Sequence, residues 1–309
     1  VRLNMNKVRH FRSLLDINRK EFIRIIERSI ELKKEAATGI INNSLSGKTM
    51  AMIFKKNSTR TRVAFETAMT TMGGHAIFLS SDSTQLSRGE ELSDTAKVLS
   101  GMVDIIVVRT HDHNEVEELA LNSRVPVING LTEKFHPCQL LADMQTYYEV
   151  KGSIEGKKVA WVGDGCNMCN SYINAAKILN FNLSIATPSG FEPDKSTLSL
   201  ASDNVELCDL PGKAVEDCDL VTTDVWSSMG DEGEAEKRKI LFKGYQINKH
   251  LFEKSKNDSI FLHCLPAHRD EEVDSDVIDG SRSKVWQQAH NRLYTSKALI
   301  EFLLQESKN

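Results

Sequence analysis

A run of hydroxyl and guanidinium side chains has the composition of an anion-binding site. Ser58-Thr59-Arg60-Thr61-Arg62 follows an apolar run and opens a helical pattern. Free backbone N–H groups at a helix start, hydroxyl donors and guanidinium groups can converge on one oxyanion. Because the run contains no glycine, it differs from a Gly-x-x-x-x-Gly-Lys nucleotide loop and suits a small, compact phosphate. The alternative is an ordinary Ser or Thr N-cap followed by two solvated arginines.

Two further segments of the first half place polar groups where a strand ends or a helix begins. Arg109 follows the predicted strand 105–108, and His136-Pro137-Cys138-Gln139 precedes a predicted helix. A histidine can donate to a carbonyl oxygen, and a glutamine can accept from an amide nitrogen. The alternatives are a salt bridge at Arg109 and a structural histidine before a proline.

The second half carries candidate groups at three places. Asp224 follows the predicted strand 220–223, in a loop that also contains Ser228-Met229-Gly230, and its carboxylate could hold an ammonium group. His263-Cys264-Leu265-Pro266 follows a predicted strand that ends near residue 262, and Asn291-Arg292 is expected to begin the last helix. Each of these segments is ambiguous when it is taken alone.

A glycine turn in the second half raises cofactor and metal alternatives. Gly163-Asp164-Gly165-Cys166-Asn167 resembles a dinucleotide turn, but Met168 occupies the place of the third glycine in Gly-x-Gly-x-x-Gly. Cys166 and Cys169 form a C-x-x-C pair, which is typical of redox centres or half of a zinc site. No second pair or His-x-x-x-His completes a zinc set. We therefore expect these cysteines to pack or to line the turn.

The elements that must position these groups follow from the apolar pattern. Gly47-Lys48-Thr49 leads into an apolar run, a turn and a helical stretch, and the same order returns at Gly156-Lys157-Lys158. Short strands are predicted at 50–54, 76–79, 105–108, 126–129, 159–162, 183–186, 220–223 and 260–263, with helical patterns between most of them. This alternation predicts an α/β protein with two doubly wound domains, each with a central parallel sheet. Ligands of such sheets bind beyond the carboxyl ends of the strands.

The sequence also predicts where the domains divide. A helix from about Cys138 to Tyr148, followed by Glu149-Val150-Lys151-Gly152, forms a plausible crossing. We therefore expect one domain of residues 1–150 and a second of residues 151–289, with a helix at about 290–309 packing back on the first. The active site is expected in the cleft between the domains.

Length, charge and cysteine usage exclude several classes of protein. The chain has 309 residues, with 39 Lys plus Arg and 43 Asp plus Glu, and a formal net charge of −4 is the wrong sign for a nucleic-acid-binding protein. No apolar run approaches the roughly 18 residues of a membrane span, and the first residues lack the apolar core of a signal peptide. Six irregularly spaced cysteines favour reduced thiols. We expect a cytoplasmic protein without nucleic-acid or membrane partners.

Taken together, these segments resemble the ornithine carbamoyltransferases of the transcarbamoylase family, and the match runs in order along almost the whole chain. The run 58–62, with Phe54 and Lys56 ahead of it, looks like the carbamoyl-phosphate signature of that family, and His136-Pro137-Cys138-Gln139 looks like its second shared motif. The segments around Asp224 and Cys264 look like the ornithine branch and unlike the aspartate branch. The resemblance implies that residues 1–150 bind carbamoyl phosphate and residues 151–289 bind ornithine.

The resemblance also implies a role for each candidate residue. Carbamoyl phosphate would be bound by Ser58, Thr59, Arg60, Thr61, Gln85, Arg109, His136, Pro137, Cys138, Gln139, Cys264, Leu265 and Arg292, and ornithine by Asn167, Asp224, Ser228 and Met229. Arg60, Arg109, His136 and Cys264 form the catalytic group, in which Cys264 lines the cleft and is no nucleophile. Gln85 would reach in from a neighbouring subunit of a homotrimer. No cofactor or metal is implied.

Two segments depart from the family's pattern. Asp270 stands where a glycine often follows the His-Arg pair, and Gln288-Ala289-His290 precedes Asn291-Arg292 where acidic residues are usual.

The implied reaction is acyl transfer without a covalent enzyme intermediate. The neutral δ-amine of ornithine would attack the carbonyl carbon of carbamoyl phosphate, and phosphate would leave. Thr61, Arg109 and His136 would stabilise the carbonyl oxygen, Arg60 the leaving phosphate, and Asn167 and Asp224 the α-carboxylate and α-ammonium. The alternatives are a transcarbamoylase for another amine such as putrescine, a non-catalytic carbamoyl-phosphate-binding protein, and a nicotinamide-dependent oxidoreductase. The same residues serve citrulline synthesis and breakdown, so the sequence leaves the direction open.

Overall fold

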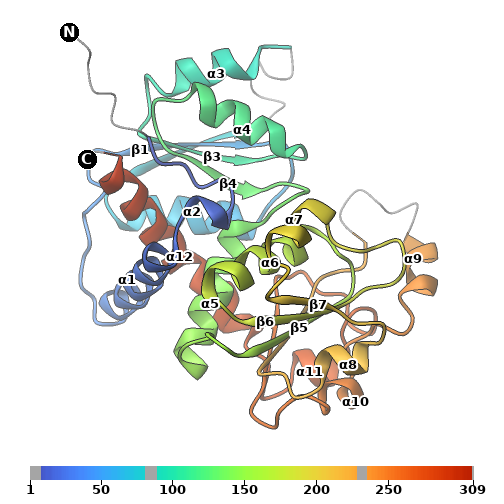
Figure 1. Cartoon of the computed structure of the whole chain (residues 1–309). Helices are drawn as coiled ribbons and strands as arrows, with labels where there is room; N and C mark the ends of the chain where they lie inside the picture. The colour runs from blue at the N-terminus through green and yellow to red at the C-terminus, as the bar shows by residue number, and fades with distance from the viewer. Residues whose placement is uncertain (1–7, 81–88, 228–234, 308–309) are drawn as a thin grey trace. The chain divides into compact units, whose positions relative to one another are not determined.

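The computed structural model describes residues 8–80, 89–227 and 235–307. They form two compact units, and the chain passes between the units at Gln145/Thr146 and again at Ala289/His290. The first unit holds the described residues up to Gln145 and those from His290 onward, and the second holds the described residues between them. Each unit contains one parallel sheet flanked by helices (Figure 1). The predicted fold class, two α/β domains with parallel sheets, is therefore confirmed.

The sheet of the first unit has four parallel strands in the order β2-β1-β3-β4. They are β1 (Thr49–Phe54), β2 (His75–Ser80), β3 (Ile105–Arg109) and β4 (Val127–Leu131). The helical segments of this unit are η1 (Leu14–Asp16), α1 (Arg19–Ala37), α2 (Arg60–Thr71), α3 (Leu92–Leu99), α4 (His113–Asn122), most of α5 (Pro137–Lys151) and most of α12 (Val285–Glu306). Figure 1 shows α3 and α4 on one face of the sheet and α1, α2 and α12 on the other. Because both faces are covered, β1 and β3 are almost continuously apolar and buried.

The sheet of the second unit has five parallel strands in the order β7-β6-β5-β8-β9. They are β5 (Lys158–Val162), β6 (Asn182–Ala186), β7 (Val205–Leu207), β8 (Leu220–Thr223) and β9 (Ile260–His263). The helices are α6 (Asn167–Leu179), α7 (Lys195–Leu200), α8 (Pro211–Val215), α9 (Ala235–Leu241), α10 (Lys249–Phe252) and α11 (Ser275–Ile278). Residues of β5, β8 and β9 form one apolar core with α8, α10 and α11.

The strand order of each sheet indicates the edge at which a ligand can bind. In the first unit the chain leaves β1 for β2 on one side and later reaches β3 on the other, and the same reversal occurs around β5 between β6 and β8. At such a switch point the connections from neighbouring strands run to opposite faces, so a crevice opens beyond the carboxyl ends of the strands. The loops after β1 and β3, and those after β5 and β8, are therefore the positions where a ligand can bind.

Two elements differ from the prediction. β7 was not predicted, because it has three residues at an exposed sheet edge and contains Glu206, so it carries little apolar signal. The last helix begins at Val285 and not at Asn291. The reason is that 285–290 contains no helix-breaking residue, and Val285 and Gln288 are buried along the same helix.

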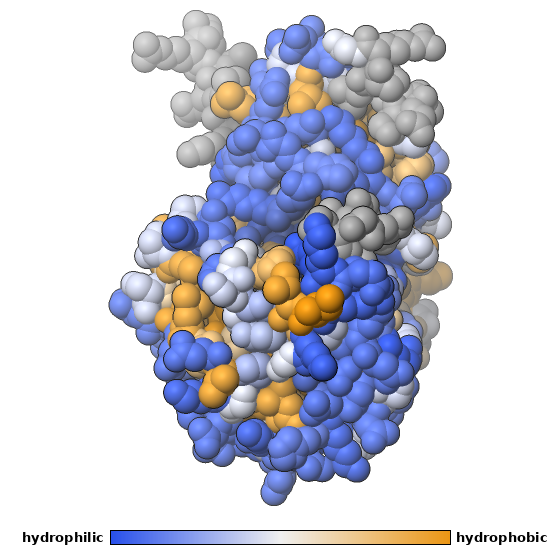
Figure 2. Space-filling view, turned by 90° about the vertical axis from the view of Figure 1, so that its right-hand side faces the viewer, coloured by the Kyte–Doolittle hydropathy of each residue, from blue (hydrophilic) through white to orange (hydrophobic). Residues whose placement is uncertain are grey.

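None of the described helices is long and apolar enough to cross a membrane. The face drawn in Figure 2 is mostly hydrophilic, and its hydrophobic atoms lie in small separate patches.

Candidate functional site

The run 58–62 follows the carboxyl end of β1 and forms the start of α2. Thr59 is the N-cap residue but makes no side-chain capping bond, whereas Ser58 Oγ accepts a hydrogen bond from the backbone N–H of Thr61 at 3.3 Å. The Thr61 side chain is fully buried, and its Oγ1 accepts a hydrogen bond from Arg292 Nη2 at 2.6 Å. A hydroxyl that accepts from a guanidinium can still donate its own proton. Thr61 is therefore oriented as a donor beside a positive charge.

The Arg62 side chain does not join the other polar groups of residues 58–62. Its guanidinium lies 3.6 Å from the ring centroid of Phe78 and its Nε is 2.9 Å from Glu66 Oε1. This side chain lies on the outer surface of α2, so it matches the alternative of a solvated arginine.

The packing behind Thr61 depends on a glycine in β4. A Cβ atom at Gly130 would lie 3.1 Å from the carbonyl oxygen of Val108 and 3.5 Å from the Thr61 methyl carbon. The absence of a side chain at Gly130 lets α2 approach the sheet closely at the residue that meets Arg292.

His136 lies at the centre of the positive groups of the first unit. It is buried, and its pKa is lowered well below the usual value, first by burial and then by the charges of Arg292, Arg109 and Arg60. Three guanidinium groups from α12, β3 and α2 thus lie near one neutral imidazole. A neutral imidazole can donate one N–H to an oxygen without carrying a charge, while the arginines supply an anion site.

The three residues after His136 have separate roles at the start of α5. Pro137 is the first helical residue, where its missing N–H has no cost. The buried Cys138 Sγ donates to the Asn129 carbonyl at 3.3 Å, and burial raises the pKa of this thiol to about 12. Gln139 Nε2 donates to Asp143 Oδ1 at 2.9 Å, whereas its buried Oε1 has no partner among the described residues. That oxygen is an acceptor suited to the N–H group of an amide.

Asp224 is the central group of the second unit, at the carboxyl end of β8. Its Oδ1 accepts from Cys264 Sγ at 3.0 Å and from the backbone N–H of Val225 at 2.8 Å, and its Oδ2 lies 3.7 Å from Cys166 Sγ. Asn167 is the first residue of α6, directly after Cys166. The structure therefore brings the loops after β5, β8 and β9 together around one carboxylate.

The two thiols beside Asp224 lie next to a negative charge. Burial, with the negative charge of Asp224, raises the pKa of Cys166 well above its usual value. Cys264 donates its S–H to the same carboxylate. Neither arrangement generates the thiolate that a nucleophilic cysteine needs.

The atoms of Asp224, His263 and Cys264 are close enough to hold a metal ion, with candidate ligand atoms within 4.8 Å of one another. Both ring nitrogens of His263 are already in contact with other groups, however. Nδ1 accepts from the Leu265 N–H at 2.9 Å, and Nε2 lies 3.2 Å from the buried Glu272 carboxylate. These contacts fix the loop after β9, where Leu265 has a left-handed φ of 56°.

The glycine turn after β5 serves the packing of the chain itself. A Cβ at Gly165 would lie 2.4 Å from the backbone nitrogen of Pro193, and the Gly165 N–H donates to the Phe191 carbonyl at 2.9 Å. Because another segment of the chain occupies the space that this glycine leaves, the turn gives no support to a dinucleotide site.

One departure from the expected pattern has a structural explanation. Asp270 has a φ of 69°, in the left-handed region that favours glycine. The aspartate thus adopts a conformation that glycine adopts more easily.

Three predicted site residues, Gln85, Ser228 and Met229, lie outside the described residues. Three residues that contact the loops of the site were not predicted, namely His113, Glu115 and Asn129. Glu115 contacts Lys55 Nζ at 2.7 Å and also Thr110, next to Arg109. Their only sequence signal was position: His113 and Glu115 follow a predicted strand, and Asn129 ends another.

The comparisons with known proteins cover both units. Residues 9–149 match the family model described as aspartate/ornithine carbamoyltransferase, carbamoyl-P binding domain, and residues 155–303 match the Asp/Orn binding domain of the same family. An ornithine carbamoyltransferase of Hydrogenovibrio crunogenus is 52% identical over 297 residues, which cover 96% of this chain and 98% of that protein.

Solved structures agree with the sequence comparison. The ornithine carbamoyltransferase of Pyrococcus furiosus has a TM-score of 0.92 and 47% identity, covering 96% of this chain and 97% of that one. That of Burkholderia thailandensis has a TM-score of 0.90 and 45% identity, covering 96% and 99%. The chain belongs to the aspartate/ornithine carbamoyltransferase family.

Proposed function

We propose that this chain transfers the carbamoyl group of carbamoyl phosphate to the δ-amine of L-ornithine, giving L-citrulline and phosphate. The observation that carries the proposal is the arrangement around His136: three arginines, a neutral imidazole and the Gln139 acceptor oxygen, which has no partner within residues 8–80, 89–227 and 235–307. These groups match, in that order, the phosphate, the carbonyl oxygen and the amide nitrogen of carbamoyl phosphate. The near-full-length relatives support the same activity.

In the proposed reaction the first unit binds the donor. Arg60 and the start of α2, with Ser58 and Thr59, bind the phosphate. Thr61, Arg109 and His136 donate to the carbonyl oxygen, which becomes negative as the amine adds. Each such donor contributes about 2.7–4 kcal/mol to stabilising the transition state. Arg292 orients Thr61, and Gln139 binds the carbamoyl amide.

The second unit binds the acceptor in this proposal. Asp224 pairs with the α-ammonium of ornithine, and Asn167, Ser228 and Met229 hold the α-carboxylate end. Cys264 and Leu265 offer backbone carbonyls to the carbamoyl amide. The neutral δ-amine attacks the carbonyl carbon, and the C–O bond to phosphate breaks. Holding two small substrates in one orientation contributes about 7–11 kcal/mol to lowering the barrier. The proposed donor-binding domain is residues 1–150 with the helix near 290–309, and the proposed acceptor-binding domain is residues 151–289.

The proposal extends to the assembly and location of the enzyme, for which the support is the resemblance alone. We propose a cytoplasmic homotrimer in which Gln85 reaches the site of a neighbouring subunit. Light scattering at several protein concentrations tests the trimer, and a Gln85→Ala chain mixed with an inactive Arg60→Ala chain tests the shared site. If Gln85 acts across the interface, mixed trimers recover activity, because some sites then combine an intact Arg60 from one chain with an intact Gln85 from the other.

A citrulline assay tests the reaction itself. Carbamoyl phosphate is supplied with L-ornithine, putrescine or L-aspartate in parallel, without added metal or nucleotide. Turnover with ornithine alone supports the proposal. Turnover with another amine would contradict the assignments of Asn167, Asp224, Ser228 and Met229, and no turnover with any amine would favour a carbamoyl-phosphate-binding protein.

A further inference from the structure

The turn that leads into His136 runs from Thr132 to Phe135, and two hydrogen bonds join these two residues. The Thr132 N–H donates to the Phe135 carbonyl at 2.9 Å, and the Phe135 N–H donates back to Thr132 Oγ1 at 3.2 Å. Both residues are buried. Because Phe135 directly precedes His136, the position of this turn sets the position of the imidazole.

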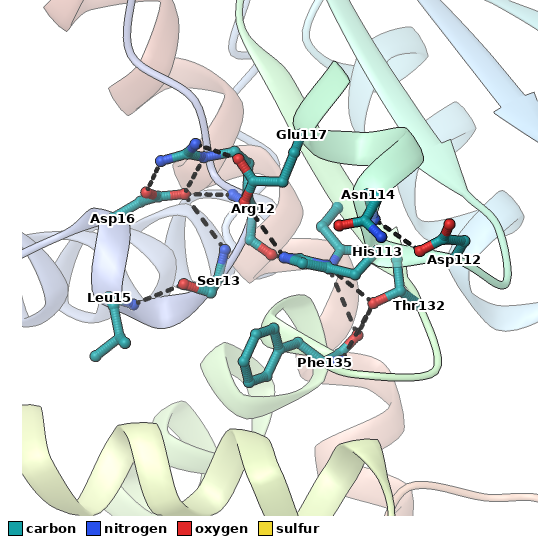
Figure 3. A network of polar contacts seen from close by, with 11 residues as sticks. Arg12, Ser13, Leu15, Asp16, Asp112, His113, Asn114, Glu117, Thr132 and Phe135 are labelled. Atoms are coloured by element: carbon teal, nitrogen blue, oxygen red, sulfur yellow. Dashed lines mark hydrogen bonds and ion pairs between the residues drawn. The ribbon is translucent and has the colours of Figure 1, made fainter. Parts of the chain in front are cut away.

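One side chain outside the turn contacts both of its ends. His113, the first residue of α4, has its Nδ1 3.2 Å from Thr132 Oγ1. Its ring also packs edge-on against the Phe135 ring, with centroids 5.1 Å apart and an interplanar angle of 85° (Figure 3). His113 thus reaches the turn through one polar and one aromatic contact.

The surroundings of His113 favour the neutral ring. Burial lowers the pKa of His113, and among the charges that face it Glu117 and Asp16 oppose this effect while Lys134 and Arg12 add to it. The neutral ring has one N–H, and Nε2 lies 3.4 Å from the Glu117 carboxylate, which can only accept. Nδ1 and Thr132 Oγ1 share one hydrogen bond whichever ring nitrogen carries the proton, and the same hydroxyl lies 3.4 Å from the Phe135 carbonyl oxygen, to which it can donate.

Glu117 is itself fixed from the opposite side. Its Oε2 lies 2.5 Å from Arg12 Nη1, and Arg12 Nη2 lies 2.7 Å from Asp16 Oδ1. Figure 3 shows these side chains forming a continuous polar path from η1 to the turn. Because both ring nitrogens of His113 have a contact, its ring cannot rotate without losing one of them.

We propose that His113 is a positioning residue for carbamoyl transfer, which fixes the Thr132–Phe135 turn and through it the orientation of His136. The inference rests on the proposed function. His113 touches neither substrate in this scheme; it acts only through the turn.

Two substitutions separate the polar contacts of His113. In His113→Asn the amide lies near the position of Nδ1 and can form the hydrogen bond with Thr132 as donor or acceptor, whereas in His113→Gln the amide lies near Nε2 and keeps only the Glu117 contact. Since misplacing a catalytic group by about 1 Å can cost about 100-fold, we expect kcat to fall by roughly 10- to 100-fold in His113→Gln. His113→Asn should stay within about threefold of wild type by the same reasoning. The KM for ornithine should be unchanged in both.

The controls separate positioning from general destabilisation. Asn114→Ala alters the next residue of α4, whose side chain is exposed, and should leave kcat and the melting temperature unchanged. A double-mutant cycle with Thr132→Val tests the route. If His113 acts through Thr132, adding His113→Gln to Thr132→Val lowers kcat no further.

The outcomes are distinguishable. An inactive wild-type enzyme would overturn the proposed function and with it the reaction assigned to His113. An active wild type with His113→Gln as fast as Asn114→Ala would overturn only the positioning role. Equal losses in His113→Asn and His113→Gln, in step with their melting temperatures, would also overturn it, because a merely structural residue behaves in that way.

Discussion

Arg60 is the first helical residue of α2 and one of the three guanidinium groups whose charges lower the pKa of His136. Its position at a helix start combines a positive side chain with free backbone N–H groups, which is the combination that binds phosphate. The two features come from one short stretch of sequence. The role proposed for Arg60 therefore depends little on distant packing.

Replacing Arg60 by alanine should lower kcat/KM by about 10²- to 10³-fold, because one strong donor to the developing negative charge is lost. The fold should be unaffected, since the side chain is only partly buried. Steady-state kinetics and a thermal melt check both statements. Arg124→Ala, at an exposed arginine of the same unit, is the matched control. Near wild-type turnover in Arg60→Ala would contradict the phosphate assignment.

The surroundings of Asp224 depend on the tertiary fold, because its neighbours come from segments that are distant in the sequence. Cys166 and Cys264 contact it from the loops after β5 and β9. The Asp224→Asn substitution keeps the shape but removes the charge that would pair with the α-ammonium of ornithine.

We expect Asp224→Asn to raise the KM for ornithine at least tenfold, in line with about 1.5–3 kcal/mol for a hydrogen bond to a charged group. Affinity for carbamoyl phosphate should not change. Initial rates measured while each substrate is varied separate the two effects, and Asp203→Asn at an exposed position of the same unit is the control. Equal loss of both affinities would show that Asp224 is structural.

Among the elements, β4 shows how a sheet edge is covered by a segment with no strong strand pattern. Phe11 pairs with Ile128 in a parallel bridge, and Asn129 Nδ2 donates to the Arg12 carbonyl at 2.9 Å. His10 Nδ1 accepts from the Val127 N–H at 3.1 Å. An imidazole can accept at Nδ1 only when that nitrogen carries no proton.

Burial lowers the pKa of His10 to about 4 from an unfolded value near 6.5. Between these values the unfolded chain binds more protons than the folded one, so the free energy of unfolding decreases as the pH falls from 6.5 to 4. The His10→Asn variant, whose amide oxygen accepts without titrating, should show a smaller decrease of Tm over this range. His250→Gln, at an exposed histidine, is the comparison. An unchanged slope in His10→Asn would contradict the assignment of the neutral His10 to this edge.

At the scale of the whole molecule, two units with their own sheets and cores are joined through two helices. The passages between the units fall within α5 and α12. The same two helices carry Gln139 and Arg292 of the proposed donor site. Carbamoyl phosphate bound as proposed would therefore contact both connecting helices.

Carbamoyl phosphate at 100 times its Kd should raise the free energy of unfolding by about 2.7 kcal/mol if it binds only the folded chain. Urea denaturation at 25 °C, with and without the compound, measures this increase. The Arg60→Ala variant should lose most of it, whereas Asp224→Asn should keep it. The same increase in both variants would place the anion site elsewhere in the protein.

The sequence by itself determined the features that are local in the chain. Short apolar runs predicted eight of the strands to within about two residues at each end, and the signal is clearest for strands buried on both faces, such as β1 and β3. The run 58–62 predicted a polar helix start for the same reason: the residues that form it are consecutive. The predicted fold class followed from the alternation of these elements.

Only the tertiary structure decided how distant residues combine. It turned Arg62 onto Phe78, placed Arg292 on Thr61 across 231 residues of sequence, and left Gln139 Oε1 without a partner among the described residues. It also placed His113, whose proposed role depends on its contacts, against a turn that begins 19 residues later. Local patterns predict elements because backbone geometry repeats along the chain, but the protonation and orientation of a side chain depend on every element packed around it.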